Sequence, residues 1–266
     1  MSKSLIFAKR NLIEMVRDPL LYIFCAGFPI ALCLMFQIIL KYSGGHTPVF
    51  EVKSLIPGLM MFSYSLLMLM SSLLVSKDKT TAFVKRLFTS PMKTKDYLIG
   101  YFIPYILIGI VQSIICIILG YIFGATSGTG FVSFGRALLL ILEMLPIMMI
   151  NIMIGMIFGT ILNDKSAPAF SSIFISSSGV LGGAWMPIDT MGDFEKFAQF
   201  LPFYPPVYLG RIITGANHTL PDNMGNPVIY TLGDNGWIHI LVLSLYFVGV
   251  LALTLLFFNK KLKSDK

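Results

Sequence analysis

Charged residues are scarce in this sequence. Only 12% of its 266 residues are Asp, Glu, Lys or Arg, whereas 56% are hydrophobic. Soluble domains carry about 25% charged residues, so the composition excludes an ordinary soluble protein and indicates a membrane protein. Basic residues outnumber acidic ones, 20 to 13, but they lie beside long apolar runs. We therefore expect them to set topology and to meet lipid headgroups, and we expect no nucleic-acid partner.

Three familiar signals are also missing. The cysteines, Cys25, Cys33 and Cys116, lie inside apolar runs without paired spacing, so they indicate neither disulfides nor a metal site. No G-x-x-x-x-G-K-[ST] loop occurs, and we expect this chain neither to hydrolyse ATP nor to hold a cofactor. The N-terminal polar section carries Glu14 and Asp18 and has no small-residue cleavage site after the apolar run that follows, which favours a retained span over a secretory signal.

Long apolar runs dominate what is present. Helices need about 20 residues to cross a bilayer, and the runs lack the alternation of barrel strands. The expected fold is therefore an all-α membrane protein of one domain, residues 1–266, with six spans at 20–40, 55–75, 97–124, 134–162, 168–183 and 237–258. The fifth span is short and rich in Ser and Gly, which predicts a place inside the bundle or at a subunit interface.

The basic residues predict the orientation. If the N-terminus is inside, fifteen of the 20 Lys and Arg residues fall on the inner side and five on the outer side. This positive-inside bias predicts a multi-pass protein of the cytoplasmic membrane, with both termini, the tail 259–266 and segment 77–96 in the cytoplasm.

Residues 1–19 read as an amphipathic helix lying on the inner leaflet. Proline disfavours a helical conformation at the residue before it, so Asp18–Pro19 should end this helix. Its apolar stripe contains Leu5, Ala8, Leu12 and Val16, and the charged side contains Lys9, Arg10, Glu14 and Arg17.

Segment 77–96 holds six basic residues between two spans. Asp78 or Thr80 could cap a short helix there, which Ser90–Pro91 would end. Phe83 with Leu87, and Val84 with Phe88, form i, i+4 pairs, whereas Lys85 and Arg86 point elsewhere. The segment is either a basic topogenic loop or a docking surface for a partner.

The region 184–236 should lie outside. Phe194, Phe197, Ala198 and Leu201 have helical spacing, which predicts a short amphipathic helix at the outer interface. Pro202 and Pro205–Pro206 should break it, and a second short element should run through Ile213. The loop 215–236 is rich in Asn, Gly, Pro and Asp, as is typical of an exposed loop.

Polar residues inside the spans are candidates for a substrate path, namely Glu143, Gln37, Gln112 and Asn151. An acid at the bilayer centre costs about 2.5 to 3.5 kcal/mol on insertion scales, so Glu143 must face protein or water. It is either a substrate contact or proton relay, or a structural partner of Arg136, Gln37 or Gln112. The methionine-rich runs in 58–72 and 145–158 fit either an adaptable path or ordinary packing, and the scattered histidines do not favour a metal site.

The whole chain resembles the transmembrane subunits of type-2 ABC exporters (ABC-2 permeases). The resemblance rests on "KDK", "VKRLF", "TSPM" and "YLIGY" between the second and third spans, on Arg10–Asn11 and Arg17–Asp18–Pro19, and on "LGGAWMP" and "FLPFYPPVYLGRIITG" after the fifth span. It implies re-entrant external helices in 184–236 and an elbow helix containing Arg10, Asn11, Arg17 and Pro19. It also implies a coupling segment in which Phe83, Lys85, Arg86, Leu87, Phe88 and Pro91 contact a separate ATPase.

The expected function is therefore a permease subunit that pairs with a second copy or a homologous permease and with two ATPase subunits, which bind Mg-ATP. An amphipathic drug, antibiotic or antimicrobial product is the expected substrate, with a polysaccharide or lipid-linked glycan as the alternative. Two alternatives come from other functional classes. One is an ATP-independent carrier or channel, and the other is an intramembrane protease that uses serines in 176–179 with His239.

Overall fold

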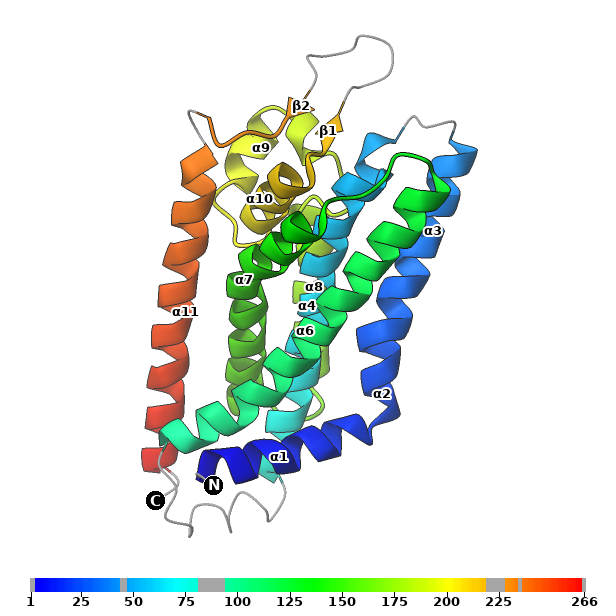
Figure 1. The fold of residues 1–266 in the computed structure, drawn as a ribbon. Helices are drawn as coiled ribbons and strands as arrows, with labels where there is room; N and C mark the ends of the chain where they lie inside the picture. Colours follow the sequence, from blue (N-terminus) through cyan, green and yellow to red (C-terminus); the bar gives the residue numbers. More distant parts are fainter. Residues whose placement is uncertain (1–2, 44–46, 81–93, 219–227, 234–235, 265–266) are drawn as a thin grey trace.

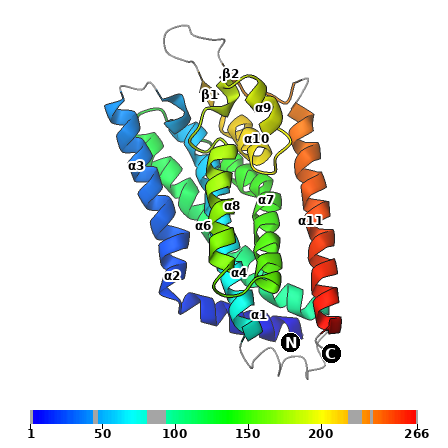
Figure 2. The same ribbon diagram turned by 180° about the vertical axis from the view of Figure 1, so that it is seen from behind.

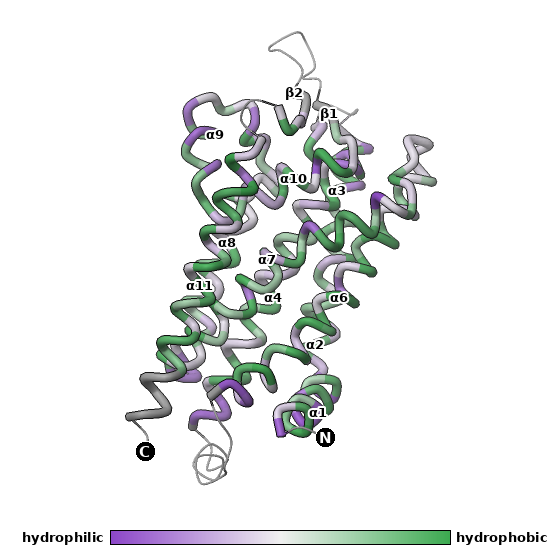
Figure 3. Tube along the Cα trace, turned by 60° about the vertical axis from the view of Figure 1, so that its left-hand side comes forward, coloured by the Kyte–Doolittle hydropathy of each residue, from purple (hydrophilic) through white to green (hydrophobic). Residues whose placement is uncertain are grey.

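The computed structural model describes residues 3–43, 47–80, 94–218, 228–233 and 236–264. In these residues the chain is almost entirely helical, and the long helices run side by side between the two ends of one bundle (Figures 1 and 2). Hydrophobic residues predominate along them, and hydrophilic residues gather mainly near the ends (Figure 3). We call the end that carries α1 and the last turns of α11 the terminal end.

In chain order the elements are α1 Lys3–Val16, α2 Pro19–Tyr22, the π-helical turn η1 Ile23–Gly27, α3 Phe28–Tyr42, η2 Pro48–Phe50, α4 Val52–Thr80, α6 Thr94–Thr126, α7 Phe134–Ile161, α8 Ala167–Leu181, η3 Ile188–Thr190, α9 Asp193–Ala198, α10 Tyr204–Thr214, β1 Asn217–His218, β2 Val228–Ile229 and α11 Gly236–Ser264. The two short strands pair antiparallel. Helices α2 and α3 continue into each other through η1 and act as one long segment.

Five helical segments within the described residues are long and apolar enough to cross a membrane, as expected of a membrane protein. They are Pro19–Tyr42, Val52–Lys79, Lys95–Thr126, Phe134–Ile161 and Gly236–Phe258. These are five of the six predicted spans, and the segment predicted as the short fifth span forms the 15-residue helix α8. Helix α8 ends early because Gly182 and Gly183 follow it, and Gly183 adopts a φ of 68°, which an α-helix does not allow.

Helix α4 forms the centre of the bundle. The apolar window of its span is 89% buried, against 22% for α11, and α4 packs most extensively against α7. The two methionine-rich runs lie on these two helices, and their Met60, Met68, Met144 and Met148 are buried. The structure thus supports the interpretation of these runs as helix packing.

Glycines let α7 approach α4 closely. A Cβ atom on Gly155 would collide with the Ser71 hydroxyl and the Met68 carbonyl of α4. Small residues at such contacts allow helices in membranes to pack backbone to backbone. The Ser71 hydroxyl uses this proximity and donates to the carbonyls of Met68, at 2.9 Å, and of Ile152 on α7, at 3.3 Å.

Replacement of Gly155 by leucine should therefore separate α4 from α7. Overpacking of a close contact typically costs about 1–3 kcal/mol, so we expect a lower thermal unfolding temperature in mild detergent. The matched control is Gly249→Leu on α11, where a Cβ atom would meet nothing within 4 Å. An equal loss in both variants would contradict the close-packing argument.

Helix α8 packs against the other side of α4 through serine hydroxyls. Ser65 donates to Ser178 at 2.8 Å, and Ser72 and Ser171 lie 3.0 Å apart. All four side chains are buried. One face of the Ser-rich run therefore packs inside the bundle, which is one of the two predicted places, while its other face is exposed.

Helix α1 lies across the terminal end of the bundle (Figure 1). It ends at Val16, and Asp18 then caps α2 by accepting from the Leu20 backbone N–H at 2.9 Å. Of the predicted apolar stripe, Ala8 is buried against the bundle, whereas Leu5 and Val16 are 45% and 47% exposed. The buried face is instead formed by Ser4, Phe7, Ala8, Asn11 and Met15.

At the opposite end, two short helices occupy the region where they were predicted. Helix α9 buries Ala198, while Phe194 and Phe197 are exposed. Pro202 lies in the non-helical segment between α9 and α10, where a break was predicted. Pro205 and Pro206 instead stand in the first turn of α10, where a missing N–H costs nothing.

Candidate functional site

At the terminal end, a polar cluster joins α1, α4 and α6. We call it the Asp78 cluster, and it consists of Arg10, Glu14, Lys77, Asp78 and Tyr101. Arg10 of α1 pairs with Glu14 at 2.6 Å and with Asp78 of α4 at 3.2 Å. Tyr101 of α6 donates to Asp78 at 2.8 Å. The Asp78 side chain is 3% exposed, so its charge is shielded from water and depends on these donors.

Further contacts seat α1 on α6. Asn11 donates to the Gly100 carbonyl at 3.1 Å, and Ser4 donates to Asp96 at 3.2 Å. The Phe7 ring packs edge-on against Tyr101, with ring centroids 5.0 Å apart, and a Cβ atom on Gly100 would collide with it. The pair Arg10–Asn11, expected in an elbow helix, therefore connects α1 to both α4 and α6.

The other two expected elbow residues have lesser contacts. Arg17 is exposed and forms no ion pair with a described residue. Pro19 begins α2, where the chain turns into the first long segment.

Asp78 does not cap a new helix as predicted, because it lies inside α4, which continues to Thr80, and the helix that Thr80 was predicted to cap lies outside the described residues. Lys79 has a different role from that of a loop residue: its ammonium donates to the carbonyls of Thr160, at 3.1 Å, and Leu162, at 3.4 Å, at the C-terminus of α7. A cation at this position donates to the last carbonyls of α7, which lack partners within the helix, and it interacts favourably with the negative end of the helix dipole.

The predicted coupling residues lie outside the described residues. They are Phe83, Lys85, Arg86, Leu87, Phe88 and Pro91. The structure does describe the helices on either side of this segment. Helix α4 ends at Thr80 and α6 begins at Thr94, and both helices are hydrogen-bonded to α1 through the contacts given above.

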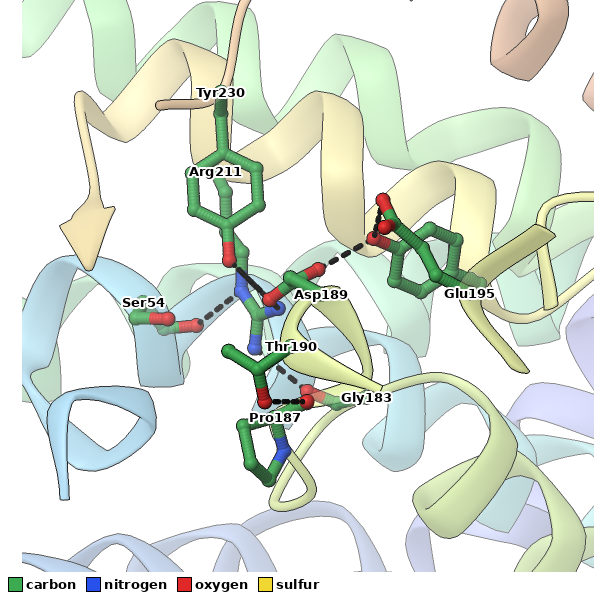
Figure 4. Close-up of polar contacts among 9 residues, drawn as sticks. Ser54, Gly183, Pro187, Asp189, Thr190, Glu195, Arg211 and Tyr230 are labelled. Carbon is green, nitrogen blue, oxygen red and sulfur yellow. Dashed lines mark hydrogen bonds and ion pairs between the residues drawn. The ribbon is translucent and has the colours of Figure 1, made fainter. Parts of the chain in front are cut away.

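A second polar cluster lies at the opposite end. We call it the Arg211 cluster: Asp189, Glu195, Tyr204, Arg211 and Tyr230 (Figure 4). Arg211 of α10 is fully buried and pairs with Asp189 at 3.2 Å. Tyr204 and Tyr230 both donate to Asp189 through short hydrogen bonds, and Tyr204 also donates to Glu195 at 3.3 Å.

Arg211 also holds backbone carbonyls from distant parts of the chain. Its guanidinium donates to the carbonyl of Gly183, at 2.6 Å, and to that of Ser54 at the start of α4, at 3.4 Å. Burial alone would lower the pKa of Arg211, but Tyr230 and Asp189 beside it hold the pKa above its usual value. The guanidinium is therefore charged, and it fixes α10 to α4 and to the segment after α8.

The polar residues inside the spans do not form one site. Gln37 donates to the Phe50 carbonyl at 2.8 Å, Gln112 to the Ser63 carbonyl at 3.1 Å, and Asn151 to the Ile147 carbonyl at 2.9 Å. Both carboxylate oxygens of Glu143 are buried and have no hydrogen-bond partner among the described residues.

The structural pairing expected for Glu143 is therefore not met. Arg136 is exposed, while the amides of Gln37 and Gln112 donate elsewhere. Arg136 precedes Glu143 by seven residues, which is about two helical turns, and its side chain is exposed near the start of α7.

Catalytic and metal sites find no support in the part of the chain that the structure describes. No group of three or more His, Cys, Asp or Glu residues there could hold a metal ion. The Ser178 hydroxyl bonds to Ser65 and to the Ile175 carbonyl, whereas the His239 ring stacks on Tyr208 with centroids 4.1 Å apart. The serine and histidine of the protease alternative thus have other partners.

The comparison with known families agrees with the arrangement of the helices. A family model described as ABC-2 type transporter matches residues 4–214, which extend from α1 to the last residue of α10. No curated protein matches the chain.

Proposed function

This chain belongs to the ABC-2 type transporter family, and we propose that it is the permease subunit of an exporter that a separate ATPase subunit drives. As a permease it is a transport subunit and not itself the catalyst. In the proposed complex, Mg-ATP binds to the ATPase subunits, and the permease works with a second copy of itself or a homologous permease.

The Asp78 cluster is the observation that carries this proposal. A movement applied to the segment between α4 and α6 must pass through the ends of these two helices. Arg10, Asp78 and Tyr101 bond those ends to each other and to α1. Displacement of segment 81–93 would therefore move α1, α4 and α6 together, and α4 is the centre of the bundle.

We further propose six crossings, with α8 as the fifth and with the terminal end in the cytoplasm. The 15 residues of α8 rise about 22 Å, and the chain then continues toward α9 and α10 at the opposite end (Figure 2). The excess of Lys and Arg at the terminal end supports this orientation. Ser172 and Ser176 on the exposed side of α8 are small enough for a second permease to approach closely.

The proposed substrate is an amphipathic drug, antibiotic or antimicrobial product that moves outward. Purification of the tagged chain from its native membrane in mild detergent tests the assembly. We expect an ATP-binding subunit to be recovered with it. Recovery of no such subunit, together with full transport by the chain alone, would contradict the proposed function.

Replacement of Phe83 or Leu87 by aspartate is expected to weaken ATPase association. Burial of each side chain in a partner contributes roughly 1.5 to 3 kcal/mol, which a charged residue would forfeit. Co-purification measures this loss, and Tyr42→Asp on the exposed end of α3 is the control. Normal assembly and transport by both variants would show that these residues do not dock.

A further inference from the structure

An apolar groove of about 670 Å³ runs between α7, α10 and α11. Its walls include Leu142, Pro146, Ile213, Leu243 and Phe247. Sites for drug-sized molecules have volumes of about 300–1,000 Å³ and apolar walls with few polar groups, so the groove has suitable dimensions for such a ligand.

The groove opens on the surface of the bundle that faces lipid in a membrane protein. Leu142 and Val248 line it and are 53% and 63% exposed, and α11 as a whole is the least buried span together with the first one. A molecule dissolved in the bilayer could enter the groove without crossing a polar barrier.

Among the described residues that line the groove, Glu143 is the only ionisable one. Its position in α7 is nine residues after Phe134, or about 14 Å along the helix. Both carboxylate oxygens lie beneath the surface without a hydrogen-bond partner among the described residues. The contrast is Asp78, the acid at the terminal end of α4, which accepts from Arg10 and Tyr101.

We propose that this groove binds an organic cation with an apolar body, and that Glu143 turns about its side-chain bonds to pair with the cationic group. The inference rests on the proposed function, because it names the class of molecule that the permease carries. A carboxylate inside a span needs a cation or a strong donor, and the protein supplies none to Glu143 within the described residues.

The same groove disfavours other ligands. An anion would be repelled by the ionised form of Glu143 that the proposed pairing requires, inside an apolar wall. A sugar would need many hydrogen bonds, but Ser244 is the other polar side chain there, and its hydroxyl already donates to the Ile240 carbonyl at 2.7 Å. A phospholipid chain would fill the volume but would leave Glu143 unpaired, so we commit to a dissolved organic cation.

Dye binding to the purified full chain tests this assignment. Rhodamine 6G serves as the lipophilic cation and Nile red as an uncharged dye, both followed by fluorescence anisotropy in a neutral detergent. Glu143→Gln keeps the shape of the side chain and removes the carboxyl group that can ionise to pair with a cation. We expect it to bind rhodamine 6G about 10-fold more weakly or worse, with Nile red unchanged, because a hydrogen bond to a charged group is lost.

Two tryptophan variants test the place of binding while Glu143 stays intact. Val248→Trp fills the groove and should weaken the binding of both dyes. Leu245→Trp is the matched control, because Leu245 is 64% exposed on the same helix and does not line the groove. Elution of all variants at the wild-type volume in size-exclusion chromatography shows that they are folded.

Each outcome decides the inference. Equal affinity of wild type and Glu143→Gln for rhodamine 6G would overturn the role of Glu143, and undiminished binding by Val248→Trp would overturn the groove. Recovery of tightly bound phospholipid with no dye binding would assign the groove to lipid instead. These measurements use the permease alone, so a failure here is distinct from a failure to recover an ATPase subunit, which bears on the proposed function.

Discussion

Replacement of Arg211 by leucine is expected to lower the free energy of unfolding by about 3–5 kcal/mol. The substitution would leave Asp189 charged, buried and without its cation, and it would also remove the donors to the Gly183 and Ser54 carbonyls. Thermal unfolding in mild detergent, followed by the fluorescence of Trp185 and Trp237, measures the effect.

An exposed ion pair provides the control for Arg211. Lys196 pairs with Asp193 at 2.8 Å, but their side chains are 77% and 94% exposed. Because water and salt screen such pairs, Lys196→Leu should change the stability very little. The double variant Arg211→Leu with Asp189→Leu should recover part of the loss, since the buried carboxylate that pairs with Arg211 is then removed as well. Wild-type stability in Arg211→Leu alone would refute this account of the cluster.

The large effect is expected because the Arg211 cluster holds together elements that have little hydrophobic core of their own. Helix α9 has six residues and α10 has eleven, and short helices need tertiary contacts to be stable. Burial raises the pKa of Tyr204 and Tyr230, and Asp189 raises it further, so both phenols stay protonated and can donate. The cluster therefore acts as the polar core of this end of the bundle.

The long helices were predictable from the sequence because lipid imposes one simple rule. A span must be apolar over about 20 residues and must satisfy its own backbone, and five segments obey both conditions. The end of α4 was not predictable from this rule. Residues 77–80 are polar and looked like a loop, yet they continue the helix because Asp78 and Lys79 find partners on α1, α6 and α7.

The candidate sites were predictable only where a residue conflicts with its surroundings. Glu143 stands out because an acid in an apolar run is costly, and the structure places it beside the groove. Arg211 and Asp189 gave no such signal, since each lies in a mixed segment that could be exposed. Asp189 and Arg211 are 22 residues apart in the sequence, and they pair because the fold brings α10 next to η3. No local sequence pattern reveals such a contact.

Replacement of Asp78 by asparagine is expected to uncouple the permease from its ATPase without separating them. Asparagine keeps the volume of the side chain and can still accept from Tyr101, but it loses the Arg10–Asp78 ion pair, the more buried of the two ion pairs between α1 and α4 among the described residues. Coupling between two sites commonly corresponds to a change of about 5–150-fold. We therefore expect the amount of substrate exported per ATP hydrolysed to fall by a factor in roughly that range.

The two effects can be separated because the Asp78 cluster consists of residues that precede or follow the predicted docking residues in the sequence and contains none of them. The ATPase should still co-purify with Asp78→Asn, in contrast to Phe83→Asp. Asp164→Asn is the control, since Asp164 is an exposed acid between α7 and α8. Export by Asp78→Asn at the wild-type ratio to ATP hydrolysis would show that movement reaches the bundle by a route other than the contacts of α1 with α4 and α6.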